Sequence, residues 1–158
     1  MDEIDTALTL VYDAIFDSGS TWALTGSLAF SMRGIDTPVG DIDIQSDKDG
    51  AYAIERRLME YVVEPVQFKE AQKIRSHFGR LAVGGARVEI MGDIEKLTPD
   101  GLWLPTPPLR SITEILTYRE MRIPVLNLEY ECHAYTLMGR TDTARLLRDW
   151  LNKRPSQR

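Results

Sequence analysis

Apolar residues recur at helical spacing in several stretches of this 158-residue chain. In the first, Ile4, Leu8 and Ile15 fall on one face and predict an amphipathic helix. Four longer helices are predicted on this basis, over residues 3–16, 51–62, 127–138 and 141–153. We expect Asp47 or Asp49 to cap the second of these helices, and Pro65 to end it because proline lacks a backbone N–H.

Short apolar or alternating runs predict the strands, at residues 21–25, 41–44, 66–68, 77–83, 87–91, 111–118 and 122–125. Gly84-Gly85 and Arg119-Glu120 each separate two adjacent runs, which predicts two hairpins. Residues 28–32 are compact enough for a short helix. Residues 92–110 carry four prolines and are expected to form a surface loop with a short strand near Trp103.

This order of elements predicts an α+β fold with a mixed central sheet, helices packed mainly on one side and a C-terminal helical pair. The length and the 43% apolar content suit a single domain over residues 1–158. No run of about 18 apolar residues occurs, so we expect no membrane span. Cys132 is the only cysteine, and the N-terminus lacks a signal-peptide pattern. A cytoplasmic location is therefore expected.

The two parts of the chain differ in charge. Residues 1–64 hold 13 acidic and 4 basic side chains, whereas residues 65–158 have a net charge of +4. The acidic part could gather cations and the basic part could contact phosphates, although ordinary scatter over solvated faces would give the same counts. The total charge of −5 does not favour a dedicated nucleic-acid-binding protein.

Residues 24–44, reading LTGSLAFSMRGIDTPVGDIDI, carry the candidate chemistry. Gly26 permits a tight turn and a close approach of the backbone to a phosphate, and Ser27 adds a hydroxyl and an N–H. Asp41 and Asp43 lie two residues apart on a predicted strand, so both point to the same face. Glu89 would join them if its strand were a neighbour. Such a carboxylate cluster suits Mg²⁺, a hard cation.

The spaced combination of these residues resembles the polymerase-beta-like nucleotidyltransferase superfamily. GS is followed after thirteen residues by DIDI, and the third carboxylate stands in RVEIMGD. The likeness is greatest to small single-domain members related to lincosamide and aminoglycoside nucleotidyltransferases and to toxin–antitoxin nucleotidyltransferases. It covers residues 20–92 as the catalytic core and, more weakly, the closing helices over 127–153.

The resemblance implies roles for five residues. Gly26 and Ser27 would grip the triphosphate of ATP or another nucleoside triphosphate. Asp41 and Asp43 would bind two Mg²⁺ ions, and Glu89 would bind one ion and accept the proton of the attacking hydroxyl. The implied reaction transfers a nucleoside monophosphate, with AMP as the leading expectation, to a hydroxyl of an acceptor and releases pyrophosphate.

Arg33, Lys73, Arg75 and Arg80 are the candidate cations for the triphosphate or for charge on the acceptor. Arg33 adjoins the Gly-Ser segment, and the other three lie in one short region. Exposure to solvent is the ordinary alternative for arginine and lysine.

Nothing in the sequence names the acceptor. A small molecule is favoured. Two further hypotheses stay open, a toxin acting on tRNA or a protein, and a non-catalytic nucleotide- or partner-binding module with the same fold. A homodimer is compatible with the sequence, but no residue argues for one.

Overall fold

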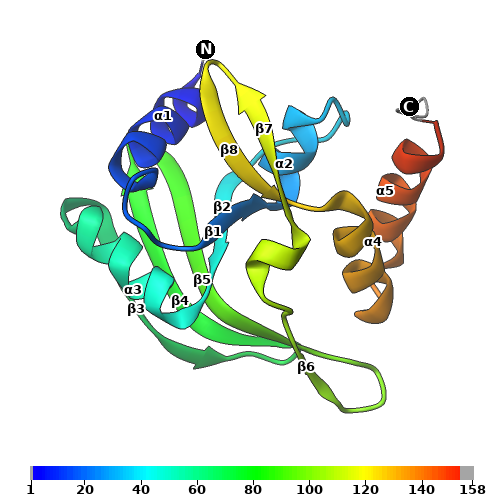
Figure 1. Cartoon of the computed structure of the whole chain (residues 1–158). Helices are drawn as coiled ribbons and strands as arrows, with labels where there is room; N and C mark the ends of the chain where they lie inside the picture. The colour runs from blue at the N-terminus through cyan, green and yellow to red at the C-terminus, as the bar shows by residue number, and fades with distance from the viewer. Residues whose placement is uncertain (1, 154–158) are drawn as a thin grey trace.

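The computed structural model describes residues 2–153, so the first residue and the last five of the expected domain lie outside the described residues (Figure 1). The helices are α1 (Glu3–Ile15), α2 (Gly26–Met32), α3 (Lys48–Arg57), α4 (Leu128–Leu137) and α5 (Thr141–Lys153), with 3₁₀ turns at Met59–Tyr61 and Leu109–Ile112. The strands are β1 (Trp22–Thr25), β2 (Asp41–Ser46), β3 (Val62–Glu70), β4 (Ile74–Val83), β5 (Ala86–Leu97), β6 (Trp103–Pro105), β7 (Thr113–Tyr118) and β8 (Met121–Leu126).

All the strands join one twisted sheet, in the order β3-β4-β5-β2-β1-β8-β7, and β6 pairs with β5. The pairs β2–β5 and β1–β8 are parallel, whereas the other neighbours are antiparallel. The predicted mixed sheet and both predicted hairpins are therefore confirmed. The parallel pairing of β2 with β5 matters most, because it joins two segments that are distant in the sequence.

The main core lies on one face of the central strands, under α1 and α3 (Figure 1). Ile42 and Ile44 of β2 and Val88 and Ile90 of β5 have no exposed surface. Burial of each such side chain contributes about 1.5–3 kcal/mol. Because successive side chains of a strand alternate between faces, the intervening residues of β2 and β5 point to the opposite face of the sheet.

The C-terminal helical pair packs beside α2 through a separate apolar cluster. Leu128 and Cys132 of α4 and Leu147 of α5 are buried together with Phe30 of α2. Asn127 caps α4 by accepting a hydrogen bond from the N–H of Tyr130. This packing brings α4 close to the turn that begins α2.

The predicted helix over 51–62 differs from the observed structure. Asp47 is its N-cap, accepting from the Gly50 N–H at 2.7 Å, so α3 begins earlier and ends at Arg57. Pro65 lies inside β3 rather than ending the helix. An edge strand tolerates proline because the backbone N–H that proline lacks would have pointed to solvent rather than to a neighbouring strand. The β3–β4 register is also irregular at this point.

The region predicted as loop over 92–110 is also more ordered than expected. β5 continues to Leu97, because Ile74 pairs with Lys96 and Trp103 pairs with Leu97. The short strand expected near Trp103 is present as β6.

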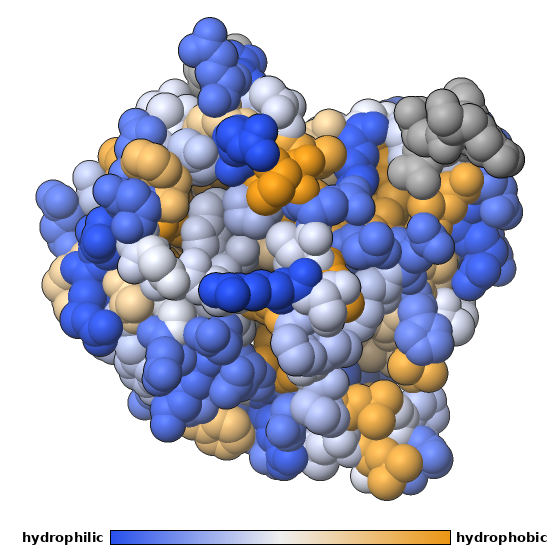
Figure 2. Space-filling view, in the orientation of Figure 1, coloured by the Kyte–Doolittle hydropathy of each residue, from blue (hydrophilic) through white to orange (hydrophobic). Residues whose placement is uncertain are grey.

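Most of the surface in Figure 2 is polar, and its apolar side chains form small separate groups, one over the β5–β6 hairpin. None of the helices in the described part of the chain combines the length and apolar content needed to cross a membrane.

Candidate active site

Three carboxylates converge on the face of the sheet opposite α1 and α3. In the parallel β2–β5 register, Asp43 lies directly opposite Glu89, and Asp41 lies two residues before Asp43. One carboxylate oxygen from each of the three residues lies within 4.8 Å of the others. The structure therefore brings together the three acidic residues that the sequence singled out.

Burial and mutual repulsion both act on the central carboxylate of this cluster, Asp43. Burial, followed by the charges of Glu89 and Asp41, raises the pKa of Asp43 to about 7. Two arginines offset part of the charge. Arg80 Nη2 lies 3.3 Å from Glu89 Oε2, and Arg87 Nε lies 3.7 Å from Asp41 Oδ1.

These residues fit a divalent metal ion. An all-oxygen set of three carboxylates suits Mg²⁺, and a cation among them would offset the repulsion that, after burial, contributes to the raised pKa of Asp43.

Gly26 forms the floor of the site beside Asp43. Its φ is +73°, a left-handed conformation that glycine adopts without strain. A β-carbon at this position would lie 2.5 Å from Asp43 Oδ2. The backbone conformation therefore favours glycine at the start of α2, and the space beside Asp43 requires it.

A cavity that is open to solvent lies in front of this turn. Thr25, Gly26, Asp43 and Glu89 form one part of its lining. Its remaining walls come from β2, β4, β5 and the C-terminal helical segment, namely Gln45, Ile74, Met91, Ile94, Lys96, Glu131, Ala134, Tyr135, Met138 and Arg140. Carboxylates at one end, and cationic and apolar groups elsewhere, suit a ligand that carries phosphates, a sugar and a base.

A protein family described as aminoglycoside-2''-adenylyltransferase matches residues 7–151 of the chain. The chain belongs to this family. It is therefore a nucleotidyltransferase, as the Gly-Ser and Asp-x-Asp pattern predicted. The comparison with curated proteins found no match.

Solved structures place this family member among nucleotidyltransferases with the polymerase-beta-like fold, which confirms the predicted fold class. A "putative nucleotidyltransferase" from Thermotoga maritima is 45% identical, with a TM-score of 0.82, and the match covers 96% of this chain and 94% of that one.

Two more distant structures share the fold. The lincosamide antibiotic adenylyltransferase LnuA, bound to lincomycin, is 15% identical with a TM-score of 0.54, covering 80% of this chain and 82% of that one. ANT(2'')-Ia, in complex with adenylyl-2''-tobramycin, is 10% identical with a TM-score of 0.59, covering 92% and 88%.

The four cations that the sequence suggested for the triphosphate or the acceptor do not line the cavity of this nucleotidyltransferase. Arg33 is largely buried, pairs with Glu114 at 2.6 Å and donates to the Leu126 carbonyl at 3.1 Å. Arg75 pairs with Glu95 and lies over the Trp103 ring.

Lys73 is exposed beside Gly139 and residues 97–99, outside the main cavity. Ser27, the partner of Gly26 in the motif, is half-buried in the first turn of α2.

Lys96 lines the cavity although strand alternation places it on the opposite face from Glu89. Asp93 has a φ of +50°, and β5 carries one more residue than β4 across this point, which is a β-bulge. The bulge shifts the alternation, so that Ile94 and Lys96 face the same cavity as Glu89 and Met91. A bulge at an aspartate leaves no clear sequence signal.

Glu131 is the second residue that the sequence reasoning missed. It is only 4% exposed, and Thr25 Oγ1 donates a hydrogen bond to its Oε1. Burial raises the pKa of Glu131 to about 7, although the Thr25 hydrogen bond and the charges of Lys96 and Arg33 oppose the shift. Its position three residues after Leu128 and four before Tyr135, within an apolar helical stripe, was the available signal.

Proposed function

We propose that this nucleotidyltransferase transfers AMP from ATP to a hydroxyl of a small-molecule acceptor, with Mg²⁺, and releases pyrophosphate. The convergence of Asp41, Asp43 and Glu89 within 4.8 Å carries the proposal. Two neighbours of the same fold are described as an adenylyltransferase bound to lincomycin and as an enzyme in complex with adenylyl-2''-tobramycin, which supports an adenylyl group and a small acceptor.

Asp41, Asp43 and Glu89 would hold the metal. When bound there, Mg²⁺ would supply charge neutralisation at the phosphates and at the departing pyrophosphate.

The chain's own groups would orient the nucleotide. The bare backbone at Gly26, which lines the cavity, would let a phosphate approach closely, and Ser27, the next residue, would contact that phosphate. Lys96 and Arg140 are the cationic side chains of the cavity lining, and we assign them to the triphosphate. Burial lowers the pKa of Lys96, partly opposed by the charge of Glu131, so a phosphate would stabilise its ammonium form.

Glu89 would accept the proton of the acceptor hydroxyl. Arg80 engages only its Oε2, and Glu89 lines the cavity. As the proton leaves, the hydroxyl oxygen attacks the α-phosphorus and the bond to the pyrophosphate breaks.

The deciding experiment compares Asp43→Asn with Asp149→Asn, an exposed residue of α5 that removes the same charge. Pyrophosphate release from ATP and Mg²⁺ is measured over a panel of hydroxylated antibiotics and sugars. Asp43→Asn should lower turnover about 10²–10³-fold, the range in which loss of one preorganised electrostatic group typically falls, and Asp149→Asn should match the wild type. Wild-type turnover in Asp43→Asn would refute the proposal.

A toxin and a non-catalytic module would each give a different result with the same protein. A toxin would label tRNA or protein when cell extract and α-labelled nucleotide are supplied. A non-catalytic module would bind ATP and Mg²⁺ in calorimetry without releasing pyrophosphate on any acceptor. The cytoplasmic location and the homodimer stay predictions.

A further inference from the structure

Glu131 of α4 reaches across to the turn that begins α2. Thr25 is the N-cap residue of α2, and an N-cap threonine ordinarily accepts a hydrogen bond from an amide of the first turn. Thr25 makes no such side-chain cap bond. Its hydroxyl donates to Glu131 Oε1 instead, a buried contact between residues 106 positions apart.

The Glu131–Thr25 hydrogen bond lies next to the backbone that contacts Asp43. Thr25 lies opposite Asp43 in the antiparallel β1–β2 register. The next residue, Gly26, packs so closely on Asp43 that no β-carbon fits between them. A displacement of Thr25 therefore moves the backbone against which the Asp43 carboxylate rests.

Packing alone does not explain a glutamate at this position. Its Oε2 is buried and has no hydrogen-bond partner among the described residues. An unsatisfied buried carboxylate oxygen costs stability, and an apolar residue of similar size would avoid that cost. A role in holding the Thr25 hydroxyl therefore explains the glutamate better than a contribution to folding stability does.

We propose that Glu131 is a positioning residue, which holds the Thr25–Gly26 turn against Asp43 and thereby sets the geometry of the three metal-binding carboxylates. Its effect on turnover rests on the proposed function. Its effect on metal affinity does not, so the positioning role of Glu131 and the proposed function can be refuted separately.

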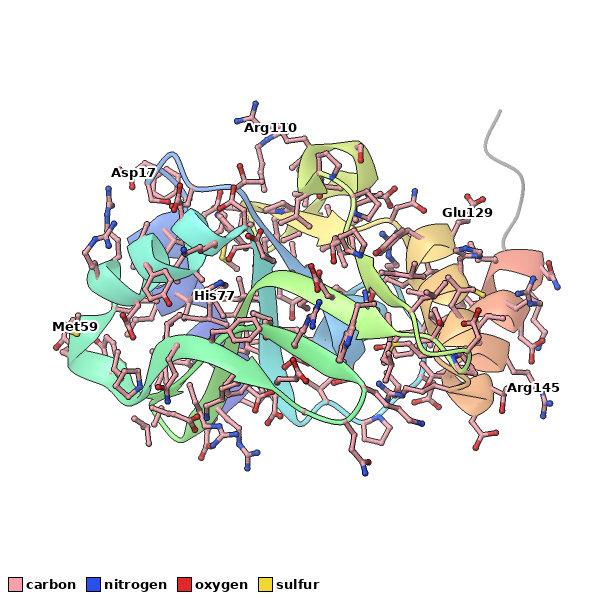
Figure 3. The ribbon with its side chains drawn as sticks, turned by 90° about the horizontal axis from the view of Figure 1, so that it is seen from below. Asp17, Met59, His77, Arg110, Glu129 and Arg145 are labelled. Carbon is pink, nitrogen blue, oxygen red and sulfur yellow. The ribbon has the colours of Figure 1, made fainter. Side chains whose placement is uncertain are left out.

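The test uses Glu131→Leu and Thr25→Val, which each remove one partner of the hydrogen bond, and Glu131→Gln and Thr25→Ser, which each keep it. Glu129→Gln is the control, because Glu129 is an exposed residue on the same helix and points away from the sheet in Figure 3. Mn²⁺ affinity is measured by calorimetry, kcat and KM by pyrophosphate release, and folding by Tm.

Glu131→Leu and Thr25→Val should each weaken Mn²⁺ binding and lower kcat about 10–100-fold, the usual effect of losing a residue that orients metal ligands. The Tm of Glu131→Leu should remain near that of the wild type, whereas the Tm of Thr25→Val should fall, because the buried Glu131 carboxylate then has no hydrogen-bond donor. The two conservative variants should remain within ~3-fold of the wild type, as should Glu129→Gln. The double variant Glu131→Leu/Thr25→Val should be no worse than either single one, because both remove the same contact.

Wild-type Mn²⁺ affinity in Thr25→Val would overturn the inference, and this variant leaves the Glu131 charge in place even if Glu131→Leu fails to fold. Additive losses in the double variant would also overturn it. If the wild type binds Mn²⁺ but no acceptor supports turnover, the proposed function fails, while the Mn²⁺ measurements still decide the role of Glu131.

Discussion

Gly26 and Asp43 touch so closely that a β-carbon on residue 26 would lie 2.5 Å from Asp43 Oδ2. The contact joins the two halves of the sequence motif, because Gly26 begins α2 and Asp43 lies on β2. It also explains why the motif needs glycine, since the left-handed backbone alone would tolerate asparagine or aspartate.

Gly26→Ala should therefore displace the Asp43 carboxylate and abolish detectable metal-dependent turnover. Gly19→Ala is a matched control, with a φ of +75° against +73° and no atom within 4 Å of the place that a β-carbon would take. Both variants should lose about 1–2 kcal/mol of stability from backbone strain. Only Gly26→Ala should lose Mn²⁺ binding in calorimetry. Equal losses of Mn²⁺ binding in both variants would contradict the role of the Gly26–Asp43 contact.

Stability should fall as pH rises in metal-free buffer. Asp43 and Glu131 each have a folded-state pKa of about 7, raised from 3.8 and 4.5. Between the unfolded and folded values the native state binds more protons than the unfolded chain, so their contribution is complete below about pH 4 and is lost as pH rises through 7.

Urea denaturation at several pH values, with EDTA present, measures this dependence. Asp43→Asn should flatten the slope between pH 5 and 7.5 and be at least as stable as the wild type at pH 7.5. The contrary result is a free energy of unfolding that rises from pH 5 to 7.5 equally in the wild type and in Asp43→Asn. It would argue against a buried cluster of mutually repelling carboxylates.

Mg²⁺ should reverse this repulsion. At 100 times its dissociation constant, a ligand that binds only the native state adds about 2.7 kcal/mol to the free energy of unfolding. The Tm of the wild type should therefore rise by several degrees with Mg²⁺ at pH 8, where the carboxylates are ionised, and less at pH 5. Asp41→Asn should show little shift at either pH, and an unchanged Tm in the wild type would remove the case for a metal site.

Lys96 rather than Lys73 should govern nucleotide affinity. Lys96→Met keeps the buried stem and removes the charge that lines the cavity, so KM for ATP should rise about 10-fold, the loss of one charge-assisted contact. Lys73→Met removes an exposed charge outside the main cavity and should leave KM unchanged. Steady-state kinetics measures KM for ATP in both variants, and a larger rise in Lys73→Met would favour Lys73, the residue that the sequence suggested, over Lys96.

Much of the site was predictable because local rules govern it. The two-residue period of a strand puts Asp41 and Asp43 on one face and Ile42 and Ile44 in the core. Glu89 between Val88 and Ile90 follows the same rule. Gly84-Gly85 has positive φ at both residues, as its hairpin turn requires.

Long-range packing decided the rest. Whether β2 and β5 pair in parallel, with Asp43 opposite Glu89, depends on contacts that no local window contains. The bulge at Asp93 moves Lys96 to the cavity, and the docking of α4 beside α2 brings Glu131 to Thr25. Arg33 adjoins the motif in sequence, yet Glu114 and the Leu126 carbonyl hold its side chain elsewhere. Periodicity determines which face a residue occupies, whereas only the assembled sheet and helices determine what that face meets.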